Sequence, residues 1–153
     1  MLQNHQSKDP KKTTEILLRQ EKETHAKTQV VIDFTTQKVI KTTLANGKRH
    51  DFRIFKESKL LIKPQTRILA DKGYQGIQRL HSHSDIPIKR RKGEPLTKEE
   101  KKSNHKLSSK RTIVENVIGF LKRFKVISDR YRNRRKRFGL RFNLIAGLRN
   151  YEL

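Results

Sequence analysis

Cysteine and tryptophan are absent from this chain of 153 residues, which also holds only one methionine and four prolines. Without cysteine the chain has no disulfides and no thiolate metal sites, which suits a reducing compartment. No apolar run approaches the ~20 residues needed to cross a bilayer, and no signal-peptide pattern follows the N-terminus. We therefore expect a cytoplasmic protein with no membrane partner.

Acidic residues are scarce, whereas basic residues abound. The chain has 15 Asp and Glu against 38 Lys and Arg, which gives a formal net charge of +23 at pH 7. This imbalance predicts a polyanionic partner, and most of the charge lies in residues 89–149. Nucleic acid is the natural candidate, although ribosomal and histone-like proteins carry similar charge without catalysis. Composition alone leaves both alternatives open.

The length fits one compact domain, and the hydrophobic content of 32% predicts a modest core. Residues 1–26 lack a sustained apolar period, so we expect an irregular polar arm there. The Val, Ile and Thr content of residues 28–35 and 38–45 predicts a β-hairpin. Residues 27–153 are therefore expected to form the folded domain.

Helices and strands alternate after this hairpin. The apolar spacing predicts a helix over 51–62 with Asp51 as its cap, a strand over 66–70, a helix over 76–83 and a strand over 85–90. Thr97 and Glu100 have the spacing of a capping box. The main helix is expected from residue 110 to about 125, and a closing helix around 144–148. Strands between helices favour a mixed α/β fold.

The string ADKGYQG at residues 70–76 places an acid, Asp71, at the end of the apolar strand. The carboxyl ends of strands in α/β sheets open onto ligand crevices, so Asp71 is a candidate catalytic residue. The alternative is structural, because an aspartate here can accept hydrogen bonds from backbone N–H groups of the following turn. This motif alone leaves both interpretations open. Tyr74 is expected to pack beneath the site.

A second acid, Glu115, lies beside the apolar stripe of the predicted main helix and shares a strip of surface with Arg111 and Lys122. The structural alternative is an ordinary ion pair between Glu115 and Arg111, four residues apart. As a pair, Asp71 and Glu115 suit a hard divalent cation, because Mg²⁺ prefers carboxylate, phosphate and water oxygens. Two such ions can assist an in-line phosphoryl displacement, a chemistry that usually needs a third acid.

Several strings in one order resemble the bacterial insertion-sequence transposases of the Asp-Asp-Glu class, most closely the group related to insertion sequence five. The resemblance covers residues 27–153. Its strings are KTQVVID (27–33), GKRHDFRIF (47–55), ADKGYQG (70–76), IPIKRRKG (86–93), RTIVENVIGFLKRFKVI (111–127), DRYRNRR (129–135) and LRFNLIAGLRNYEL (140–153). It implies an α/β fold with a ribonuclease H-like mixed sheet and flanking helices.

The resemblance implies a transposase, or a transposase fragment, that cleaves phosphodiester bonds and transfers DNA strands. Asp71 would be the second metal-binding acid and Glu115 the third, with Mg²⁺ or Mn²⁺ in a two-metal site. The family's first acid lies on an earlier strand, and no matching string precedes residue 27, so we expect the first strand to be missing. An out-of-frame origin of residues 1–26 would explain this. The alternative function is a catalytically inactive, basic DNA-binding remnant.

The basic residues predict a surface that contacts DNA phosphates with little sequence preference. The candidate DNA-binding residues are Lys89, Arg90, Arg91, Lys92, Arg111, Lys122, Arg130, Arg132, Arg134 and Arg135. By the resemblance, the expected partners are transposon ends and target DNA, and assembly of a homo-oligomer on DNA is an open alternative. The expected location is the bacterial cytoplasm, in association with the nucleoid.

Overall fold

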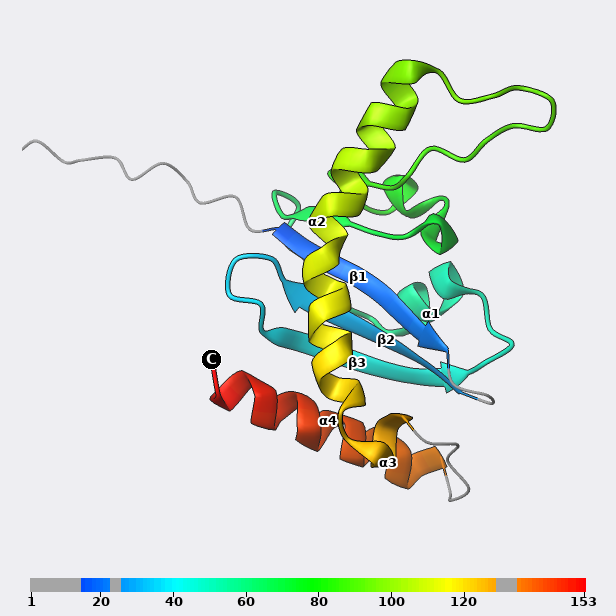
Figure 1. Cartoon of the computed structure of the whole chain (residues 1–153). Coiled ribbons are helices and arrows are strands. Elements are labelled where there is room, and N and C mark those ends of the chain that lie inside the picture. Colours follow the sequence, from blue (N-terminus) through cyan, green and yellow to red (C-terminus); the bar gives the residue numbers. More distant parts are fainter. Residues whose placement is uncertain (1–14, 23–25, 129–134) are drawn as a thin grey trace, which may run out of the picture.

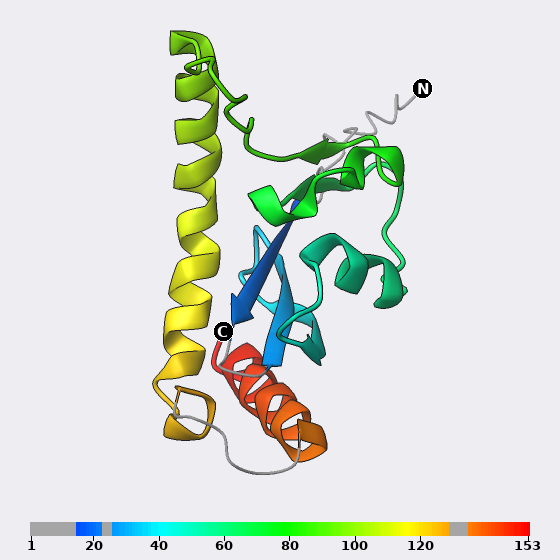
Figure 2. The ribbon, with the colours of Figure 1, turned by 90° about the vertical axis from the view of Figure 1, so that its right-hand side faces the viewer.

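A computed structural model describes residues 15–22, 26–128 and 135–153, and it contains a mixed sheet with helices on both faces (Figures 1 and 2). The strands are β1 (Glu15–Lys22), β2 (Ala26–Asp33), β3 (Val39–Asn46), β4 (Arg67–Leu69) and β5 (Ser84–Asp85). Their order is β3-β2-β1-β4-β5. The first three strands are antiparallel, whereas β4 runs parallel to β1 and β5 parallel to β4. The predicted α/β class is confirmed.

Strand β1 is the largest departure from the sequence prediction. Residues 15–22 form a strand at the centre of the sheet, where the sequence predicted part of an irregular polar arm. Ile16 is buried and pairs with Asp33 of β2 on one side and Ile68 of β4 on the other. The polar sequence of β1 lacks a strand pattern, but ladders on both sides satisfy its backbone. Residues 1–14 lie outside the described part of the chain.

Side chains alternate between the two faces of the sheet, as the two-residue period of a strand requires. On one face, Val30 and Ile32 belong to a core cluster with the helices α2 (Lys98–Lys122), α3 (Lys125–Ser128) and α4 (Arg135–Tyr151). On the opposite face, Val31 packs with residues of α1 (Asp51–Glu57) and of the turns after β4. Figure 2 shows α2 and α1 on opposite sides of the sheet.

The predicted hairpin is confirmed as β2 and β3. Asp33 lies in its turn, where one carboxylate oxygen accepts hydrogen bonds of 2.8 Å from the backbone N–H groups of Thr35 and Thr36. The next element, α1, is shorter than the predicted helix over 51–62. It ends at Glu57, and Lys59 has a φ of 47°, in the left-handed region, which stops the helix before Pro64.

Two predicted elements between residues 76 and 90 are much shorter in the structure. The expected helix over 76–83 is a single 3₁₀ turn, η2 (Ile77–Arg79), and Gly76 before it has a φ of 93°. The expected strand over 85–90 ends as β5 at Asp85. Pro87 has no N–H group to donate to a ladder, and the side-chain amide of Asn104 binds both backbone groups of Ile88.

Helix α2 begins where the sequence predicted, since Thr97 and Glu100 form a complete capping box. It continues for 25 residues, so the capping box at Thr97 and the main helix expected from residue 110 belong to one helix. Its predicted apolar stripe is buried against the sheet at Val114, Val117, Ile118 and Leu121. No helix in the described ranges is long and apolar enough to cross a membrane.

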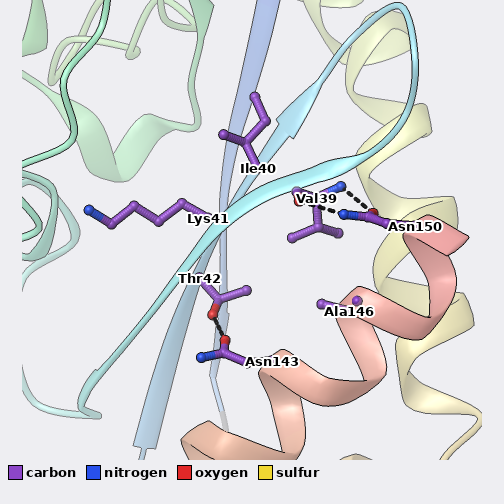
Figure 3. A pocket seen from close by; sticks show the side chains of 8 residues that line it. Val39, Ile40, Lys41, Thr42, Asn143, Ala146 and Asn150 are labelled. Atoms are coloured by element: carbon purple, nitrogen blue, oxygen red, sulfur yellow. Dashed lines mark hydrogen bonds between the residues drawn. The ribbon is translucent and has the colours of Figure 1, made fainter.

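Helix α4 covers the outer edge of the sheet and is longer than the predicted closing helix around 144–148. The side-chain amide of Asn150 accepts a hydrogen bond from the N–H of Val39 and donates one to its carbonyl, both at 2.8 Å (Figure 3). A second contact joins Thr42 of β3 to Asn143. Asn150 thus binds both backbone groups of Val39 on the outer strand, which makes them unavailable for pairing with another chain.

Candidate active site

Asp71 follows β4 directly and caps the 3₁₀ turn η1 (Lys72–Tyr74). Its Oδ1 atom accepts a hydrogen bond of 2.6 Å from the backbone N–H of Lys72 and one of 2.8 Å from Nη1 of Arg111. The structural interpretation of Asp71 as a turn cap is therefore correct, but it involves only one oxygen. Within the described ranges, Oδ2 has no hydrogen-bond partner, and the side chain is 41% exposed.

Arg111 connects Asp71 to the second candidate acid. It lies on α2, 40 residues further along the chain, and its side chain is only 16% exposed. Glu115 follows one helical turn later on the exposed side of the same helix. Residues four apart on a helix have Cβ atoms about 5–6 Å from each other, so the Arg111 ion pair brings the two acidic motifs to one region. The Nε atom of Arg111 is buried without a hydrogen-bond partner.

A third acid does not join this pair in the described ranges, where no group of three or more His, Cys, Asp or Glu residues could hold a metal. The parallel register pairs Glu15 with Arg67 and Leu17 with Leu69. If the pairing of β1 with β4 continued for two more residues, position 19, which is an arginine, would lie level with Asp71. Glu15 lies at the other end of β4, where Lys110 and Arg67 neutralise it.

Asp51 is a neighbour of the Asp71 turn that the sequence prediction assigned a different role. His50, and not Asp51, is the N-cap of α1. The Asp51 carboxylate instead binds Lys27 at 2.7 Å and lies against Gly73 of the turn. The signal in the sequence is Gly73 itself, because a glycine between Lys72 and Tyr74 leaves space for a side chain from elsewhere.

The predicted DNA-binding residues fall in several places. Lys89 to Lys92 are exposed in the loop that leads to α2 (Figure 1), and Lys122 is exposed at the end of α2. Arg111 differs from them because it is largely buried in its ion pair. Three of the predicted residues lie outside the described ranges, namely Arg130, Arg132 and Arg134. The side chain of Arg135 is likewise not described.

A mixed sheet with an acid after its fourth strand and another on the helix that packs across it defines a nuclease-like architecture. In agreement, the family model of the DDE superfamily endonucleases matches residues 6–150, and the chain belongs to this family. Its sheet and flanking helices are consistent with the ribonuclease H-like fold of these nucleases.

A transposase is among the relatives of the chain. It is 49% identical over 127 residues to the probable transposase for insertion sequence element IS702 of Microchaete diplosiphon. The match covers 83% of this chain and 46% of that protein, so the chain spans about half the length of its relative. No solved structure matches the chain. The predicted resemblance to insertion-sequence transposases of the DDE class is therefore confirmed.

Proposed function

We propose that the chain is the catalytic part of an insertion-sequence transposase that cleaves phosphodiester bonds and transfers DNA strands with a divalent metal. The single observation that supports this most is the ion pair between Asp71 and Arg111, which brings the acid after β4 beside the helical turn of Glu115. This contact supports a site built from two acidic motifs that are distant in sequence, near the carboxyl end of a buried strand, where α/β proteins hold their ligands.

The oxygen donors of Asp71 and Glu115 match the ligand preference of a hard divalent cation. Mg²⁺ is commonly bound by one or two carboxylates, with substrate phosphates and water completing its shell. The unpartnered Oδ2 of Asp71 and the exposed position of Glu115 suit this donor set. When bound, Mg²⁺ or Mn²⁺ would supply an activated water and neutralise charge on the phosphate. The described residues do not support the second metal of the family's two-metal scheme, since they offer no third acid.

The chain's own residues would place the DNA around this pair. Arg111 holds Asp71 in place before DNA arrives, and its guanidinium can bind a phosphate in a fork geometry when the ion pair opens. Lys122 lies seven residues beyond Glu115 on α2, about 10 Å along the helix axis. Exposed Lys89, Arg90, Arg91 and Lys92 would contact the backbone of the same DNA.

The partners that follow are transposon ends and target DNA, bound as a homo-oligomer in the bacterial cytoplasm. The formal charge of +23 supports a polyanionic partner, and we expect binding to weaken steeply with salt. Family membership does not favour the alternative of an inactive DNA-binding remnant.

A nicking assay tests the proposal. The chain is incubated with supercoiled and linear DNA carrying the ends of its insertion sequence, with Mg²⁺, Mn²⁺ or EDTA. We expect metal-dependent cleavage that Asp71→Ala and Glu115→Ala abolish, while Glu99→Ala, another exposed acid of α2, leaves it unchanged. Salt-sensitive DNA binding without cleavage by the unaltered chain would contradict the catalytic function and support the non-catalytic remnant.

A further inference from the structure

The turn that carries Asp71 is held against α1 by an acid outside the proposed metal site. A Cβ atom added to Gly73 would lie within 3.0 Å of both Oδ2 and Cγ of Asp51, a separation that real Cβ atoms essentially never show. The Asp51 carboxylate therefore occupies the space beside Gly73, two residues after Asp71. Only glycine fits at position 73 while Asp51 keeps this place.

Asp51 is itself fixed from the sheet. The ammonium group of Lys27, on β2, donates a hydrogen bond of 2.7 Å to Oδ1 of Asp51 and another of 3.0 Å to the carbonyl of Arg49. Both side chains of the ion pair are largely buried, at 18% exposed for Lys27 and 23% for Asp51. Partial burial weakens solvent screening, so this pair holds its geometry better than a fully exposed one. The contact with Gly73 thus has a rigid support in β2.

Apolar contacts dock the remainder of the turn on the same helix. Tyr74 is fully buried, and its ring meets Phe55 of α1 edge to face with centroids 6.3 Å apart. A Cβ atom at Gly76 would come within 3.3 Å of the Phe52 ring. These contacts fix the end of the turn that lies away from Asp71, whereas Asp51 contacts the part nearest to it.

We propose that Asp51 is a positioning residue, which acts through Gly73 to hold the Asp71 carboxylate in its place at the end of β4. Lys27 fixes Asp51 in turn. This inference rests on the proposed role of Asp71 in metal binding and cleavage. Asp51 is not a third ligand, since Lys27 neutralises it and no three acids come together in the described ranges. The His-Asp string and the Gly-Tyr string of the sequence thereby form one structural unit.

The test is a set of five variants: Asp51→Asn, Asp51→Ala, Gly73→Ala, the Asp51→Ala and Gly73→Ala double variant, and Glu57→Gln. Glu57→Gln is the matched control, because Glu57 is an exposed acid at the other end of α1. Three quantities are measured for each: kcat and KM in the nicking assay, Mn²⁺ affinity by electron paramagnetic resonance of free Mn²⁺, and thermal unfolding.

We expect Asp51→Ala to lower kcat and Mn²⁺ affinity about 10- to 100-fold, the usual cost of losing a group that orients a ligand, with KM for DNA unchanged. Asp51→Asn preserves the shape and should restore most of both. Gly73→Ala should lower kcat further, but the double variant should come close to Asp51→Ala alone. Removing the carboxylate takes away the two atoms that clash most, and of the three nearest atoms only the Cβ of residue 51, at 3.1 Å, still contacts the added methyl group.

Three results would overturn the inference: multiplied losses in the double variant, wild-type kcat and Mn²⁺ affinity in Asp51→Ala, or equal losses in Glu57→Gln. If the unaltered chain cleaves DNA while Asp51→Ala behaves like it, the positioning role fails and the proposed function stands. If the unaltered chain binds Mn²⁺ without cleaving, and Asp51→Ala weakens that binding, cleavage fails and the positioning role stands.

Discussion

The two ends of β4 use the same ion-pair chemistry for different purposes. At the amino end, Arg67 binds Asp85 of β5 at 2.5 Å and Glu15 of β1 at 3.6 Å, and Lys110 of α2 binds Glu15 at 3.2 Å. Both oxygens of Glu15 accept bonds from Lys110. At the carboxyl end, Asp71 has one cationic partner, and one of its oxygens has no partner in the described ranges.

The difference shows how to separate a structural acid from a candidate ligand. At the amino end, the opposite charges of three strands and one helix neutralise one another, which raises the pKa of the Arg67 guanidinium, mainly through its hydrogen bond to Asp85. At the carboxyl end, a carboxylate keeps an oxygen available and stays 41% exposed. The first arrangement neutralises its acids within the sheet, whereas the second leaves one oxygen of Asp71 available to the proposed metal.

Exchanging aspartate for asparagine at each end is expected to give the largest contrast. Asp71→Asn should reduce cleavage about 10³-fold or more, as removal of an electrostatic catalytic group does, with thermal stability nearly unchanged. Asp85→Asn should leave cleavage within about twofold, because Asp85 only binds Arg67. Single-turnover nicking rates and thermal unfolding of both variants measure this. Equal losses of activity in Asp71→Asn and Asp85→Asn would show that the two ends of β4 do not differ in function.

Loss of Glu15 should affect stability and not catalysis. Its side chain is only 16% exposed and neutralises Lys110 and Arg67, so Glu15→Gln should lower the free energy of unfolding by about 1–2 kcal/mol. Urea unfolding checks the size of the change. The nicking rate of the folded variant should equal that of the unaltered chain, and a large fall in that rate would place Glu15 in the site.

Arg111→Gln should separate metal binding from DNA binding. The ion pair with Asp71 competes with a cation for the same carboxylate, so its removal should raise Mn²⁺ affinity about 2- to 5-fold without DNA, the range expected for a partly exposed pair. DNA affinity and cleavage should fall. Calorimetric titration with Mn²⁺ reports the first effect, and a weaker Mn²⁺ affinity would instead identify Arg111 as a support that the site needs.

The smallest effect is expected at Glu57, whose ion pairs with Arg49 and Arg53 serve as a reference for exposed pairs. Its hydrogen bond from Arg53, with a further contribution from Arg49, lowers the pKa of the Glu57 carboxyl. A lowered folded-state pKa adds stability above the ordinary value near 4.5, and that stability is lost as pH falls through the lowered value. Arg53→Gln should therefore raise the Glu57 pKa. Carboxyl-carbon NMR titration measures this, and an unchanged pKa would show that Arg53 contributes nothing.

Local sequence patterns predicted the parts of the molecule whose structure depends on local chemistry. The hairpin, the strand that ends before Asp71, the Thr97 capping box and the apolar stripe of α2 all follow from residues close in sequence. β1 could not be predicted this way, because its polar segment becomes a strand only through pairing with β2 and β4. The helix expected over 76–83 is reduced to the turn η2, because the chain after it returns to the sheet and pairs as β5 with β4.

The candidate site was likewise predictable only where it depends on local sequence. Asp71 and Glu115 were identified as candidates from their motifs, but the ion pair between Asp71 and Arg111 joins the turn after β4 to α2, 40 residues further along the chain. The role of Asp51 was missed because its partners, Lys27 and Gly73, lie 24 residues before it and 22 after it. Local reasoning favoured a helix cap for this residue, whereas tertiary contacts use its carboxylate.

Iron-mediated cleavage of the chain itself reports whether Asp71 and Glu115 hold one metal ion. Fe²⁺ replaces Mg²⁺ at hard-ligand sites, and with ascorbate and peroxide it cuts the polypeptide next to the bound metal. A metal held by Asp71 and Glu115 should give two sets of fragments, with ends near Asp71 to Gly73 and near Glu115. Excess Mg²⁺ should suppress both sets, and Asp71→Ala should abolish them. Fragments that end elsewhere, or cleavage unaffected by Asp71→Ala, would contradict a metal site formed by Asp71 and Glu115.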